Sequence, residues 1–191
     1  MNDEDFSDLE KAILDREAVA IDELLSSGAE VENKRSEYNI FDYACMFNDV
    51  ILARKLLKCG ASIHGHPRKR QPIFWAVQEQ SLDMLNFCLA NGVSPNVHET
   101  DRDCGSEYMM TPLRNAAAEG FIMSIDPLLA AGADINAQDF EESKPLHLAL
   151  LYEQFEFAEI LVKKGARTDI KDQDSVTVIS ISKTVACPFE I

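Results

Sequence analysis

Residues 128–137 read Leu-Leu-Ala-Ala-Gly-Ala-Asp-Ile-Asn-Ala, and the Leu-rich run that ends in glycine recurs along the chain. The glycines that end such runs are Gly28, Gly60, Gly92, Gly132 and Gly165, at intervals of 32, 32, 40 and 33 residues. A residue just past a helix end often takes a left-handed conformation, which glycine adopts without a Cβ penalty. The phrase therefore predicts one kind of helix end at each position, and its period indicates a repeat architecture.

A second phrase opens with a proline twenty residues before each of the last three glycines, at Pro72, Pro112 and Pro145. Proline suits the first turn of a helix, where its missing N–H costs nothing. Each unit is therefore predicted to be a helix, a short turn, a second helix, a glycine stop and a hairpin loop.

Together the two phrases resemble the ankyrin repeat family, whose repeats open with Thr-Pro-Leu-His-x-Ala-Ala and close with Leu-Leu-x-x-Gly-Ala-Asp-x-Asn. Residues 111–113 and 145–149 match the opening phrase, and residues 132–137 match the closing one. The resemblance covers roughly residues 7–182 and implies an all-α ankyrin repeat solenoid of helix-turn-helix units joined by hairpin loops. It predicts one domain over 1–191, with repeats at about 7–34, 35–66, 67–106, 107–139 and 140–172 and a C-terminal cap at 173–191.

Several positions depart from the family pattern. The first unit lacks the proline phrase and offers the capping-box sequence Ser-Asp-Leu-Glu at 7–10. Asp42 stands where the family has histidine, whereas His147 keeps that histidine, to which the resemblance gives a structural role at the turn. The mid-repeat glycine survives as Gly120, and Asn48 is expected to replace it with the same left-handed conformation.

Two segments have conflicting signals. Pro127 falls inside the second helix of the fourth unit, where it should kink the helix or delay its start. Residues 176–182 are β-branched and alternate, which favours a strand, but they fall in phase for a closing helix. We expect a short capping helix there.

Acidic residues dominate the charge, with 33 Asp and Glu against 18 Lys and Arg and a formal net charge of −15. Such a surface repels nucleic-acid phosphates and anionic lipid and attracts basic partners, although it also serves solubility alone. The acidic segment 1–6 lacks the features of an export signal, and no apolar run is long enough to span a bilayer. We therefore expect a cytoplasmic protein that binds neither nucleic acid nor membrane. The cysteines are expected to be reduced thiols, mostly in the core: Cys45, Cys59, Cys88, Cys104 and Cys187.

In the ankyrin family, partners bind the hairpin tips and the concave face made by the first helices. Several residues that the resemblance places there are large and apolar, as is usual for anchors of a binding patch, although some can instead fold back onto the neighbouring repeat. The predicted partner-binding residues are Tyr38, Met46, Phe47, Arg70, Gln78, Glu79, Asp101, Asp103, Glu107, Tyr108, Met110, Glu119, Phe140, Glu141 and Tyr152.

Two loops add charge to these tips. The interval of 40 residues holds an insertion of about seven residues within 98–110, which is either an acidic finger for a basic groove or a solvated loop. Residues 64–70 are basic, and in isolation they suggest phosphate contact or nuclear import. In an acidic protein we expect them to form a local salt bridge or a solvated tip instead.

Catalysis has no visible basis in the sequence. No glycine-rich phosphate loop or activated nucleophile is recognisable, and Cys59, His64 and His66 lack the spacing of a zinc site. We expect no enzymatic activity, no cofactor, no metal and no small-molecule substrate.

The expected function is a module that binds one basic partner protein and is monomeric when free. The family includes stand-alone bacterial immunity proteins that block a toxin, and the acidic charge suits such an inhibitor of a basic toxin or enzyme. A non-inhibitory scaffold or adaptor is the alternative, and a metal-binding or enzymatic protein is a third.

Overall fold

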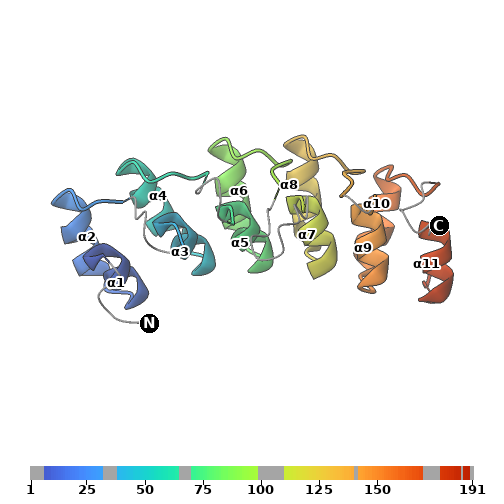
Figure 1. The fold of residues 1–191 in the computed structure, drawn as a ribbon, viewed down its shortest axis with the longest axis horizontal. Helices are drawn as coiled ribbons and strands as arrows, with labels where there is room; N and C mark the ends of the chain where they lie inside the picture. The colour runs from blue at the N-terminus through green and yellow to red at the C-terminus, as the bar shows by residue number, and fades with distance from the viewer. Residues whose placement is uncertain are drawn as a thin grey trace.

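The computed structural model is a row of helix pairs in two tiers (Figure 1). It describes residues 7–31, 38–64, 70–98, 110–139, 142–169, 177–185 and 187–189. This part of the chain contains eleven α-helices, one 3-10 helix and no strand. The all-α repeat solenoid expected from the sequence is confirmed.

One tier consists of the first helix of each unit. These helices are α1 (Asp8–Leu14), α3 (Ile40–Met46), α5 (Pro72–Gln78), α7 (Pro112–Glu119), α9 (Pro145–Leu151) and α11 (Val178–Thr184). Each packs against the next in an unbroken series from α1 to α11. The prolines at the starts of α5, α7 and α9 occupy the first turn, as their sequence position predicts.

The other tier consists of the second helices, each packed on the first helix of its own unit. These are α2 (Ala18–Ser26), α4 (Val50–Lys58), α6 (Leu82–Ala90), α8 (Ile125–Ala130) and α10 (Phe155–Lys163). The hairpins that follow are linked in part by asparagine side chains. The Asn96 amide oxygen accepts from the backbone N–H of Asp134 at 2.9 Å, and that of Asn136 accepts from Arg167 at 2.9 Å.

The five glycine stops have the predicted left-handed backbone, with φ between 85° and 94°. After each glycine, the next N–H donates to a carbonyl in the last helical turn, as Ala133 does to Leu128 at 2.9 Å. Between the two helices of a unit, Asn48 and Gly120 are also left-handed, at φ 52° and 70°.

In the other units, the same turn contains left-handed residues that the sequence did not predict. Arg16, Gln80 and Glu153 take positive φ values of 57°, 48° and 57° at the equivalent positions. The residue after each of them donates its N–H to a carbonyl inside the first helix, as Ser81 does to Ala76 at 2.9 Å. Helix packing in the repeat thus imposes the left-handed turn on residues that disfavour it.

The two conflicting segments follow the expectations drawn from the repeat. Residues Ile122–Ser124 form a 3-10 turn, η2, and α8 begins only at Ile125, so Pro127 delays the helix. Proline removes one helical hydrogen bond and clashes with the carbonyl four residues earlier, which accounts for the late start. At the C-terminal end, α11 is a helix in which the Thr177 hydroxyl accepts from the backbone N–H of Ser180 at 3.1 Å.

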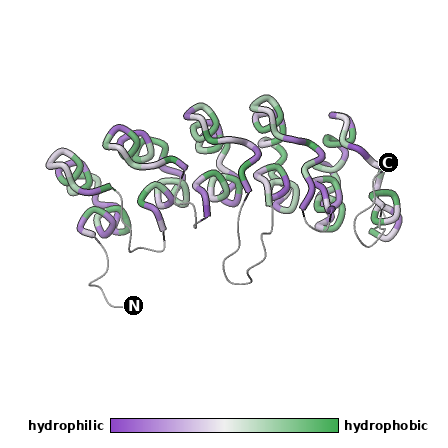
Figure 2. The backbone as a smooth tube through the Cα atoms, turned by 45° about the horizontal axis from the view of Figure 1, so that its top comes forward, coloured by the Kyte–Doolittle hydropathy of each residue, from purple (hydrophilic) through white to green (hydrophobic). Residues whose placement is uncertain are grey.

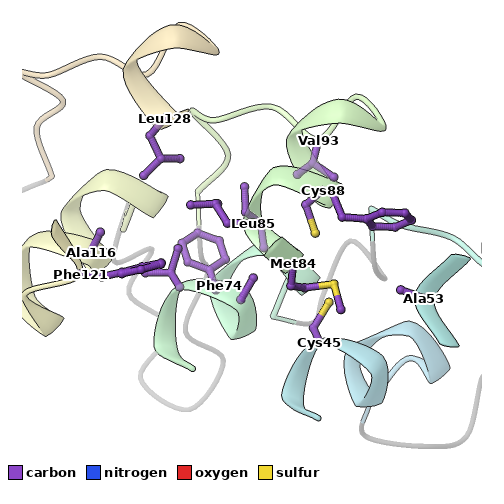
Figure 3. Packing of buried hydrophobic residues seen from close by; sticks show 14 of the residues in the cluster. Cys45, Ala53, Phe74, Met84, Leu85, Cys88, Val93, Ala116, Phe121 and Leu128 are labelled. Carbon is purple, nitrogen blue, oxygen red and sulfur yellow. The ribbon is translucent and has the colours of Figure 1, made fainter. Parts of the chain in front are cut away.

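The core is one continuous cluster that runs from Leu9 to Val178. Figure 3 shows buried side chains from three successive units, among them Phe74, Met84 and Leu128, filling the space between the units. Hydrophobic and hydrophilic segments recur in every unit (Figure 2), as expected when each repeat buries faces against both neighbours. None of the helices in the described ranges is long and apolar enough to cross a membrane.

The cysteines are only partly in this core. Cys45 and Cys88 are buried, whereas Cys59 is exposed and Cys187 is half-buried. Cys104 lies outside the described residues. Burial raises the pKa of the Cys45 thiol well above its usual value, and a hydrogen bond with Cys88 raises it further.

Candidate functional site

The first helices present two rows of side chains, four residues apart and therefore on the same side of each helix. The mid-helix row is Lys11, Tyr43, Trp75, Asn115, Leu148 and Ile181. The helix-end row, at or just past the last helical residue, is Asp15, Phe47, Glu79, Glu119, Tyr152 and Val185. Because consecutive first helices pack together, equivalent positions line up from unit to unit. These two rows, with their neighbours Met46, Gln78, Ala118 and Leu151, are called the first-helix face below.

Aromatic rings occupy the part of this face formed by α3 and α5. The Tyr38 ring meets Tyr43 and Trp75 edge-on, with centroid distances of 5.8 Å to each. The Tyr43 hydroxyl donates to the buried carboxylate of Glu10 in α1 at 2.7 Å. These ring contacts join two repeats through Tyr38, whose predicted contact with a partner stays a prediction.

Two aromatic rings of the first-helix face, Trp75 and Phe47, have an arginine guanidinium over one ring face. The Arg70 guanidinium lies 4.4 Å from the Trp75 ring centroid and also donates to the side-chain oxygen of Gln78. The Arg16 guanidinium lies 4.6 Å from the Phe47 ring. Aromatic faces attract cations through the ring quadrupole, so this surface already holds positively charged groups of its own chain.

The character of the face changes along the stack. Gln78, Glu79 and Glu119 are exposed, and the backbone carbonyl of Glu119 accepts from the Gln80 side chain at 3.2 Å. Leu151 and Tyr152 at the end of α9 are 61% and 56% exposed, which is unusual for such large apolar side chains. The predicted residues Met46 and Met110 are half-buried against the core. The face is therefore aromatic at α3, acidic at α5 and α7, and apolar at α9.

Two buried donors on this face have no acceptor among the described residues. The Asn115 side chain is 7% exposed, and its Nδ2 atom is buried without a hydrogen-bond partner. The Nε1 atom of Trp75 is also buried and unpartnered. Buried polar groups are nearly always hydrogen-bonded, so these two atoms are donors that an acceptor from outside the described residues could satisfy.

Six of the predicted partner-binding residues lie outside the described residues: Asp101, Asp103, Glu107, Tyr108, Phe140 and Glu141. The acidic insertion therefore stays a prediction. The described ranges contain no group of three His, Cys, Asp or Glu side chains placed to hold a metal ion.

Sequence reasoning did not foresee how differently the family's histidine position is filled. Its occupants are Glu10, Asp42, Phe74, Arg114 and His147, and all are buried. The Asp42 carboxylate accepts from the backbone N–H of Asn39 at 2.7 Å, and His147 Nδ1 accepts from that of Lys144 at 3.3 Å. The structural role expected of His147 is thus confirmed, and a carboxylate performs the same role in the second unit.

Arg114 uses the same position to join two units. Its guanidinium donates to the carboxylate of Asp139 in the following hairpin, and the two side chains are 2% and 14% exposed. The other carboxylate oxygen of Asp139 accepts from the backbone N–H of Ser143 at 2.8 Å. An arginine directly after the Pro-Leu phrase was the available signal for this buried pair.

No protein-family model matches the chain. Its relatives include a putative ankyrin repeat protein of fowlpox virus, 25% identical over 132 residues, which are 69% of this chain and 30% of that protein. The putative palmitoyltransferase ZDHHC13 of Danio rerio is 23% identical over 140 residues, 73% of this chain and 21% of that protein. Neurogenic locus notch homolog protein 2 of Homo sapiens is 27% identical over 171 residues, 88% of this chain and 7% of that protein. The chain thus spans less than a third of the length of each of these relatives.

Proposed function

Because the chain fits the ankyrin repeat family in both its fold and its relatives, we propose that it is a protein–protein interaction module. It binds one partner protein through the first-helix face and the adjoining hairpin tips. The observation that carries the proposal is the mixture of exposed apolar and acidic side chains on this face, from Glu79 and Glu119 to Leu151 and Tyr152. Aromatic and apolar anchors beside charged groups are typical of protein interfaces.

The proposed partner is a basic protein. The net charge of −15 steers positively charged surfaces toward the chain and repels phosphate backbones and anionic lipid. The proposal includes a cytoplasmic location and a monomeric free state.

In its narrower form, the proposal is that binding neutralises the partner, as an immunity protein neutralises a basic toxin or enzyme. Charge complementarity supports this form because it accelerates capture. The alternative is a scaffold or adaptor that holds its partner without inhibiting it. An activity assay on the captured partner separates the two, since an inhibitor abolishes the activity and an adaptor leaves it unchanged.

The experiment is affinity capture from the native cell followed by mass spectrometry. The wild-type chain is compared with a face variant, Glu79→Gln/Glu119→Gln/Tyr152→Ala. A control variant, Glu23→Gln/Glu156→Gln/Met123→Ala, neutralises two glutamates and truncates one large apolar side chain at exposed positions of α2, α10 and η2. We expect one basic protein to be captured by the wild type and the control, and to be lost with the face variant and at high salt. Equal capture by the face variant, or capture of acidic proteins alone, contradicts the proposal.

A further inference from the structure

The centre of the first-helix face holds two carboxylates that the described part of the chain leaves unpaired. Glu79 and Glu119 end the adjacent helices α5 and α7, and both are exposed. Neither makes an ion pair with a described residue. In the second-helix tier, Asp22 pairs with Lys55 and Asp126 with Lys164, each at 2.5 Å, whereas Glu23 and Glu156 make no ion pair with a described residue.

A second observation points to a ligand at the same place. Asn115 lies one turn before Glu119 on the same side of α7, and its buried Nδ2 lacks an acceptor among the described residues. The Trp75 side chain is placed in the same way relative to Glu79 on α5, and its buried Nε1 also lacks one. The carbonyl groups of an extended backbone that crosses the face are acceptors that such donors can use.

Apolar groups flank this centre on both sides. Phe47 lies at the end of α3, where Arg16 covers one ring face, and Leu151 and Tyr152 lie at the end of α9. The order along the face is therefore aromatic, acidic, acidic and apolar, with one element contributed by each successive repeat.

Resting on the proposed function, we infer that the partner inserts an extended segment with two basic side chains in its middle and an apolar side chain at each end. The basic side chains pair with Glu79 and Glu119, and the apolar ends contact Phe47 and the Leu151–Tyr152 pair. Neighbouring helix axes are about 8–10 Å apart, and an extended chain advances about 3.3 Å per residue. The four contacting side chains of the partner segment therefore stand at about every third position.

Two other occupants fit less well. A second copy of this chain brings a second surface of net charge −15 against Glu79 and Glu119, which like-charge repulsion opposes. The acidic residues of 99–107 in the same chain suffer the same repulsion.

The test is selection of a displayed library of random twelve-residue peptides on the whole chain. We expect the enriched peptides to carry two Lys or Arg residues that are three positions apart. One apolar residue should stand three positions before the first of them, and another three positions after the second. They should bind the wild type about tenfold more tightly than Glu79→Gln/Glu119→Gln, because each exposed ion pair contributes at most a few-fold. The matched control, Glu23→Gln/Glu156→Gln, changes the net charge equally on the second-helix tier and should bind like the wild type. Melting temperatures of all variants should agree within about 2 °C.

The outcomes separate this inference from the proposed function. Peptides that lose affinity with Phe47→Ala or Tyr152→Ala but show no preference for basic residues overturn the inference and leave the function standing. Acidic peptides, or no enrichment, overturn the inference directly. Peptides that tolerate every change on the first-helix face contradict both. Concentration-dependent dimerisation that Tyr152→Ala abolishes shows that a second copy is the occupant, which also overturns the inference.

Discussion

The guanidinium of Arg114 in α7 donates to the carboxylate of Asp139, which stands in the hairpin leading to the next repeat. The pair is almost fully buried, unlike the exposed ion pair between Lys164 and Asp126 that also links these two units. Buried ion pairs are costly to break because the remaining charge is left without a partner. The pair therefore ties the fifth unit to the fourth.

Replacing Asp139 by Ala should lower the free energy of unfolding by about 3–5 kcal/mol, because the Arg114 guanidinium stays buried without its carboxylate. Urea unfolding measures the change. The control is Glu159→Ala, which removes an exposed pair with Lys163 and should cost at most about 1 kcal/mol. Equal losses in the two variants would show that the Arg114–Asp139 pair contributes no more than a surface pair.

Replacing Asp42 by Ala should cost about 1–3 kcal/mol, because the buried N–H of Asn39 loses its acceptor. Asp42→His restores the family residue, and its Nδ1 can accept the same bond as His147 does in the fifth unit. We expect this variant to recover most of the stability in thermal unfolding. A histidine variant as unstable as the alanine variant would mean that the carboxylate charge, rather than an acceptor, is required.

Gly132→Val should destabilise the stack by about 1–3 kcal/mol, since a β-branched residue resists φ near 94°. An added Cβ at this position has nothing within 4 Å, so the loss reports backbone conformation rather than a clash. Gly132→Asn should cost clearly less, because asparagine tolerates the left-handed region. Unchanged melting of the valine variant would mean that Gly132 does not act as a helix stop.

Because the Cys45 thiol is buried, we expect the folded protein to lose stability in alkaline solution. Its pKa is raised in the folded protein, mainly by burial, so the folded state keeps this proton where the unfolded chain has released it. Its contribution is complete below about pH 8.5 and falls by up to about 1.4 kcal/mol per pH unit above that. Urea unfolding between pH 8 and pH 10 should show a shallower decline for Cys45→Ala than for the wild type. The exposed-thiol variant Cys59→Ala should decline like the wild type, and identical slopes in all three proteins contradict the prediction.

The sequence predicted those features that local chemistry decides. Glycine at φ near 90° ends each second helix, and Pro127 delays α8, because backbone sterics act within a few residues. The closing helix α11 was predicted from repeat phase against its β-branched composition. Val178 is buried and α11 packs on α9, so burial outweighs local propensity there.

Features that depend on packing between units could not be predicted from the sequence. The left-handed turns at Arg16, Gln80 and Glu153 are imposed by helix pairs, although none of these residues favours that conformation. The Tyr38 ring meets Trp75 of a different repeat edge-on, a contact that a family position alone does not specify. The candidate site was predicted as a set of tips and helix ends, whereas the acidic centre flanked by apolar groups emerges only when the helices are aligned.

Contact between the partner and the first-helix face is tested most directly by hydrogen–deuterium exchange of the chain, free and bound to its captured partner. We expect slower exchange on binding at the ends of α5, α7 and α9, around residues 78–80, 118–120 and 151–153, with little change in α4, α6 and α10. Protection confined to the second helices, with those three segments unchanged, would contradict it.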